Sequence, residues 1–181
     1  MGGKAVVDGL VKREYITDRQ KRINRMELLD EIIYQYELAE AKGVHLPQSK
    51  KAAMLDFVRE RAALERIHRS ETDMLFFAYE YFSEERNPNN QGNLIPKGIM
   101  INDAPEFHIE LTDILNVLSN EEINKRIAWS APRGHAKSAY LSNVFPLHQV
   151  VFEKRKYILI ISETDSASKK FVEWIGNELK Y

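Results

Sequence analysis

Apolar residues recur every three or four positions along two long stretches near the N-terminus. Between residues 17 and 42 they lie on one helical face, at Ile23, Met26, Leu29, Ile33 and Tyr36. Gly43 is a natural stop for this helix, and Pro47 opens a second one. Its apolar face holds Met54, Phe57, Val58, Ala62, Leu64 and Ile67. The pattern predicts two charged helices packed as a hairpin, within a helical N-terminal region over residues 1–70.

The first of these helices begins with basic residues, at Arg19, Lys21, Arg22 and Arg25. Two interpretations are open. The residues form a basic patch for DNA or a partner protein, or they form a solvated face with local salt bridges, which we favour.

Residues 74–82 are dense in aromatic side chains, and Asp73 lies at the position of a helix N-cap. Base stacking on single-stranded nucleic acid is one use of such a segment, but platforms of that kind have basic residues between the rings. Here the neighbours are acidic, so we expect the rings to form a hydrophobic core. Residues 87–93 then read as a polar linker, and residues 107–118 as an amphipathic helix.

A different pattern begins at residue 126. Residues 127–129 are a short apolar run suited to a buried strand, a tight turn follows, and residues 139–151 are apolar enough for a helix. Residues 156–161, KYILII, have the composition of a strand, and Thr164 starts a capping cluster before a last helix. The order strand, loop, helix, strand, helix predicts a parallel crossover unit, so the expected fold class is α/β.

The turn between this strand and helix carries residues suited to phosphate. A phosphate-binding loop reads G-x-x-x-x-G-K-[ST], and the same register here is Ala131-Pro132-Arg133-Gly134-His135-Ala136-Lys137-Ser138. Both signature glycines are alanine, so we expect the alanines to keep ordinary dihedrals and Gly134 to supply the unusual turn. The alternative is a solvated loop that closes a strand. A helix N-terminus directly after the loop favours phosphate.

Composition narrows the classes of protein. Lys and Arg number 26 against 27 Asp and Glu, so the net charge of -1 gives no overall bias towards nucleic acid. The absence of cysteine excludes disulfides and thiolate metal sites, and the histidine spacing does not suit zinc. No apolar run approaches the length of a membrane span. These features predict a soluble, intracellular protein.

The run APRGHAKS, with an apolar strand before it and KYILIISET after it, resembles the start of the ATPase domain of tailed-phage large terminase subunits. These are DNA-packaging motors with an N-terminal P-loop ATPase of the additional-strand type and a C-terminal nuclease. The resemblance covers residues 73–181 and is strongest over residues 126–163. It implies a P-loop NTPase domain from residue 71 to residue 181, with a sheet that stops after its second strand. Its implied partners are double-stranded DNA, the small terminase subunit and the portal, in the host cytoplasm and without a membrane.

The resemblance also implies a site for ATP and Mg²⁺. Lys137 is expected to neutralise the β- and γ-phosphates, Ser138 to coordinate Mg²⁺, and Arg133 to stabilise charge on the γ-phosphate during transfer. The rest of the loop is expected to cradle the phosphates, through Ala131, Pro132, Gly134, His135 and Ala136. Phe107 and His108 lie in a segment that resembles the one framing the nucleotide in this family, and the ring of one or the other is expected near the adenine. The alternative for Phe107 is a residue that packs into the core.

Hydrolysis also needs carboxylates at the end of another strand. Glu163 is a poor candidate, because the acidic strand comes later in the family and Ser162 stands at the position of its aspartate. The chain is therefore expected to be a fragment, inactive alone, that lacks the acidic strand and the nuclease. The alternative function is a non-enzymatic helical module that binds a packaging partner.

Overall fold

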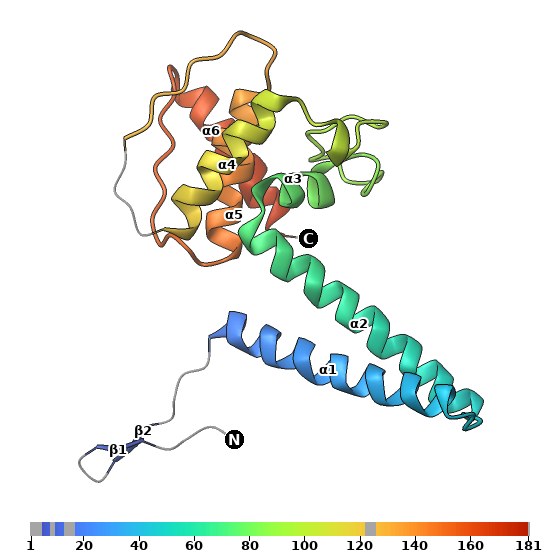
Figure 1. Ribbon diagram of the computed structural model, residues 1–181. Coiled ribbons are helices and arrows are strands. Elements are labelled where there is room, and N and C mark those ends of the chain that lie inside the picture. Colours follow the sequence, from blue (N-terminus) through green and yellow to red (C-terminus); the bar gives the residue numbers. More distant parts are fainter. Residues whose placement is uncertain (1–4, 8–9, 13–16, 122–125, 181) are drawn as a thin grey trace. The chain divides into compact units, whose positions relative to one another are not determined.

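The computed structural model describes residues 5–7, 10–12, 17–121 and 126–180 (Figure 1). The chain divides into two compact units, Met1–His68 and Arg69–Tyr181.

The first unit contains a short hairpin and two helices. Strands β1 (Ala5–Val7) and β2 (Leu10–Lys12) pair antiparallel. Helix α1 (Asp18–Ala41) begins at Thr17, whose side-chain oxygen accepts a 3.2 Å hydrogen bond from the N–H of Gln20. The chain turns at Gly43, with φ of 75°, and α2 (Gln48–Thr72) follows Pro47. The two predicted N-terminal helices are confirmed.

Charged side chains join the two helices. The guanidinium of Arg25 donates two hydrogen bonds of 2.7 Å to the two carboxylate oxygens of Glu60. Arg61 Nε lies 2.7 Å from the carboxylate of Asp30, and the rings of Tyr36 and Phe57 are 6.5 Å apart. Arg25 thus takes part in an ion pair, as expected for a solvated face with local salt bridges.

The second unit is built around helix α3 (Met74–Phe82). Helix α4 (Glu106–Asn120), the 3₁₀ turn η1 (Ile101–Asp103), the π-helix η2 (Ala139–Val144) and helix α5 (Phe145–Val151) all pack against α3. Helix α6 (Asp165–Glu178) packs against η2. Phe77 and Phe82 are only 3% and 4% exposed, so the aromatic residues of α3 form a core, as the sequence predicted.

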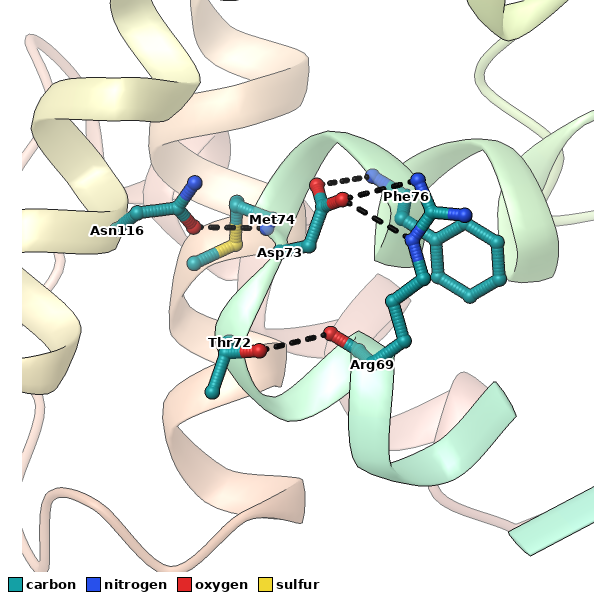
Figure 2. Close-up of polar contacts among 6 residues, drawn as sticks. All are labelled: Arg69, Thr72, Asp73, Met74, Phe76 and Asn116. Carbon is teal, nitrogen blue, oxygen red and sulfur yellow. Dashed lines mark hydrogen bonds and ion pairs between the residues drawn. The ribbon is translucent and has the colours of Figure 1, made fainter. Parts of the chain in front are cut away.

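Figure 2 shows how the start of α3 is fixed. The carboxylate of Asp73 accepts a 2.9 Å hydrogen bond from the N–H of Phe76 and lies 3.3 Å from Arg69 Nη2. The guanidinium of Arg69 also lies 4.1 Å from the centroid of the Phe76 ring. Asn116 of α4 accepts a 2.7 Å hydrogen bond from the N–H of Met74. The predicted N-cap is confirmed, and a side chain of α4 satisfies a second free N–H of this helix start.

Residues 87–93 form a loop that is attached to α6. Trp174 Nε1 donates a 3.1 Å hydrogen bond to the carbonyl oxygen of Gly92, and Asn90 Nδ2 donates one of 3.1 Å to Glu178. The Trp174 ring lies 5.2 Å from that of Phe82. Trp174, one of the apolar residues of the last helix, is therefore packed against the core of this unit.

A buried polar network joins the helices of the same unit. His148 of α5 is 1% exposed, and its Nε2–H donates a 2.9 Å hydrogen bond to the carbonyl oxygen of Ser70. The side-chain amide of Gln149 donates to His148 Nδ1 at 3.1 Å and to the hydroxyl of Ser119 at 2.9 Å. Each ring nitrogen of His148 thus has a hydrogen-bond partner when the imidazole is neutral, because Nε2–H donates and Nδ1 accepts.

The predicted α/β fold is wrong: the protein is mainly helical, and the hairpin β1–β2 is the only sheet within the described ranges. Residues 127–129 and 156–161, both predicted to be strands of a P-loop NTPase, form neither strand nor helix in the structure. Tyr157 and Ile161 are 81% and 82% exposed. A strand is stabilised by pairing and by a covered face, and here the helices around α3 occupy the core that a parallel sheet would need.

Candidate functional site

Residues 131–138 form an exposed turn whose backbone has two unusual positions. Gly134 has φ of 86°, as predicted. Ala136, at the place of the second signature glycine, has φ of 50°, so the expectation that the alanines keep ordinary dihedrals is wrong for this residue. A left-handed conformation costs an alanine roughly 1 kcal/mol, and the loop adopts it nevertheless.

Lys137 folds back over the turn. Its Nζ donates hydrogen bonds to the carbonyl oxygens of Ala131 and, at 2.6 Å, of Pro132. Lys137 is half-buried, whereas Arg133 is exposed. The loop therefore holds one cation against its own backbone and offers a second to solvent.

A helix begins at the end of the loop. Lys137 and Ser138 form its first helical residues, η2 and α5 continue it, and Ser138 has ordinary helical dihedrals of -66° and -32°. Within the described part of the chain, the main-chain N–H groups of residues 136–139 have no hydrogen-bond acceptor. These groups carry the partial positive charge of a helix N-terminus next to the Lys137 ammonium, which suits an anion.

The first residues of helix α4 lie against the loop. His108 Nε2 donates a 3.2 Å hydrogen bond to the carbonyl oxygen of His135, and the ring of Phe107 lies 5.5 Å from that of His135. The structure thus brings together the loop and the two upstream residues that the family resemblance had implicated.

Two residues beside the loop were missed by sequence reasoning. The ring of Trp129 lies 5.7 Å from that of Phe107, and the ring of Tyr140 lies 4.8 Å from that of His108. The indole N–H of Trp129 and the hydroxyl of Tyr140 are buried and have no hydrogen-bond partner among the described residues. Tyr140 comes four residues after Ala136, one helical turn further on. That spacing was the signal in the sequence that could have placed Tyr140 beside the loop.

Around the Ser138 hydroxyl, which the resemblance implicates in Mg²⁺ binding, the described residues assemble no set of metal ligands. In the ranges that the structure describes, no group of three or more His, Asp or Glu side chains is placed to hold a metal ion. Glu163 lies in an exposed segment. A single hydroxyl is nevertheless compatible with Mg²⁺ that arrives with a nucleotide, because Mg²⁺ keeps several waters and takes its other ligands from the phosphates.

None of the helices within the described residues combines the length and the apolar character that crossing a bilayer requires.

Comparison with known proteins found no relative of this chain. No family model, no curated protein and no solved structure matches this chain, so the assignment of function depends on the residues of the site and on the sequence pattern around them.

Proposed function

We propose that residues 131–138 bind the phosphates of ATP together with Mg²⁺. One observation carries the proposal: Ala136 takes the left-handed backbone conformation of the signature glycine whose place it occupies, immediately before Lys137 and the free N–H groups of a helix start. Glu153, in the turn after α5, is the other described non-glycine residue with a positive φ, so it is the position of Ala136 directly before Lys137 and the helix start that supports the site.

Each side chain has a distinct part in this proposal. Lys137 releases the carbonyl oxygens of Ala131 and Pro132 and binds the β- and γ-phosphates in their place. Ser138 holds Mg²⁺, which neutralises phosphate charge, and the exposed Arg133 contacts the γ-phosphate. The contact from His108 to the carbonyl of His135 holds the loop against α4.

The wider role that we propose is the ATP-binding portion of a viral DNA-packaging motor in the host cytoplasm, with double-stranded DNA, the small terminase subunit and the portal as partners. This part depends on the sequence resemblance over residues 126–163.

Titration of the chain with Mg-ATP by calorimetry tests the site. Wild type is expected to bind and Lys137→Ala to lose at least tenfold in affinity, because a lysine that contacts two phosphates is removed. Lys170→Ala, which removes an exposed lysine of α6, is the matched control and is expected to bind like wild type. Equal affinity of all three proteins, or no binding by wild type, contradicts the proposal.

A second function is favoured by the helical hairpin of the first unit. Leu28 of α1 and Leu55 of α2 are 51% and 57% exposed, which suits a helical module that binds a packaging partner. The test is binding of a small terminase subunit to wild type and to three variants. Loss of binding in Leu28→Glu and Leu55→Glu, with binding retained in Lys137→Ala, would support this function independently of the ATP site.

A further inference from the structure

The segment that joins α5 to α6 exposes three large apolar residues at alternate positions. Tyr157, Leu159 and Ile161 are 81%, 66% and 82% exposed. Ile158 and Ile160, which lie between them, are half-buried. Alternation with a period of two is the pattern of a β-strand that has one face covered. The segment therefore presents one apolar face to solvent.

The backbone of this segment has no partner. In the described part of the chain, no main-chain group of residues 157–162 forms a hydrogen bond with another main-chain group. Figure 1 accordingly draws the connection from α5 to α6 as a plain trace and not as a strand arrow. The sequence YILIIS carries no charge and contains neither proline nor glycine. Segments with these properties pair readily with a β-strand of another chain.

The charges at the two ends of the segment indicate which strand fits it. Arg155 comes shortly before the apolar residues and Glu163 shortly after them, and both are exposed. Among the described residues, the Arg155 guanidinium donates to the carbonyl oxygens of Lys154 and Leu118 and has no carboxylate partner. An antiparallel strand is complementary if it places an acid opposite Arg155 and a base opposite Glu163. A second copy of the same segment has this order of charges.

We infer that the chain dimerises by antiparallel β-pairing of this segment with the same segment of a second copy. When Leu159 faces the same residue of the second copy, Tyr157 faces Ile161. Arg155 then faces Glu163, on the same exposed side of the pair. Every contact occurs twice around a twofold axis, so the assembly closes at two copies. Apolar contact and opposite charge between facing side chains stabilise such a pair.

Sedimentation velocity of the full chain tests the dimer. One pair of short strands buries little surface, so dimerisation is expected in the micromolar range, with a monomer at low concentration and a dimer at high concentration. Leu159→Lys places two ammonium groups opposite each other and is expected to stay monomeric. Leu159 is exposed, so circular dichroism should show an unchanged helical content. Val172→Lys, at a 58% exposed residue of α6, is the matched control and is expected to dimerise like wild type.

Charge reversal tests the register of the pair. Arg155→Glu and Glu163→Arg each place like charges opposite each other at both ends of the dimer. Each variant alone is therefore expected to dimerise about tenfold more weakly than wild type. In an equimolar mixture of the two variants, opposite charges face each other again at both ends, and heterodimers are expected with nearly wild-type affinity. Only contacts between chains can restore dimerisation on mixing.

A monomer at every concentration overturns the proposal, and so does dimerisation of Leu159→Lys with wild-type affinity. Equal affinities of the two charge variants alone and in the mixture overturn the register. Growth of wild type into large species that bind an amyloid dye overturns the closed pair, because it shows open-ended stacking. The samples contain no nucleotide, so these outcomes are independent of the ATP site.

Discussion

The ammonium of Lys137 lies 2.6 Å from the carbonyl oxygen of Pro132, five residues earlier in the same loop. The lysine that the sequence assigns to phosphate is thus attached to the loop backbone. Binding of an anion must exchange these carbonyl contacts for contacts to the ligand, which makes the loop conformation and the lysine interdependent.

Replacement of Lys137 by alanine is therefore expected to loosen the second unit even without ligand. The loss of its contacts to two carbonyls lowers the free energy of unfolding by about 1 kcal/mol. Urea unfolding followed by tryptophan fluorescence measures this, because both tryptophans, Trp129 and Trp174, belong to the second unit. An unchanged transition midpoint, equal to that of Lys170→Ala, would show that these contacts do not contribute.

Replacement of Ala136 by glycine is expected to stabilise the second unit. Ala136 has φ of 50°, which glycine adopts without a steric penalty, so Ala136→Gly raises the free energy of unfolding by roughly 0.5–1 kcal/mol. Ala62→Gly, in an exposed part of α2, should instead cost about 1 kcal/mol, because helical dihedrals favour alanine. The idea fails if both substitutions destabilise the chain equally.

Acid is expected to destabilise the second unit through His148. Burial lowers the pKa of this imidazole from 6.5 to about 4. Between these values the unfolded chain binds a proton that the folded chain does not, so unfolding is favoured as pH falls. Above pH 6.5 the contribution of neutral His148 to the free energy of unfolding is complete. Acidification to pH 4 lowers the free energy of unfolding by roughly 3 kcal/mol.

Urea unfolding at a series of pH values from 7.5 to 4 measures this dependence. His148→Gln is expected to show a weaker pH dependence over this range, whatever its stability at pH 7.5. His45→Gln, at an exposed histidine of the first unit, keeps the wild-type dependence. Identical pH profiles for His148→Gln and wild type would assign the acid sensitivity to other groups.

The cap of α3 offers a separable test of its two contacts. Asp73→Ala removes the acceptor for the N–H of Phe76 and is expected to cost about 1 kcal/mol. Asp73→Asn keeps an N-cap oxygen but loses the charge that faces Arg69, and the cost should be less than half as large, since exposed ion pairs contribute little. Asp113→Ala, at an exposed position of α4, is the control. Equal losses for both Asp73 variants would assign the stability to the ion pair.

Local signals in the sequence were sufficient to predict most of the helices and the position of the loop. The period of apolar residues in α1 and α2, the cap at Asp73 and the glycine at 134 act within a few residues, so they can be read along the chain. The residues expected at the loop and the start of α4, including His108 and His135, lie together in the structure. The strand predictions failed because residues 156–161 have strand composition, but composition does not provide a neighbour to pair with.

The sequence by itself therefore determined the helical periodicity, the caps and the order of residues in the candidate loop. Only the tertiary structure decided that α3 rather than a sheet forms the core, and that Tyr140 and Trp129 pack against His108 and Phe107 at the start of α4. It also decided that Ala136 adopts a positive φ. These features depend on contacts between residues far apart in the chain, whose packing free energy outweighs local propensity.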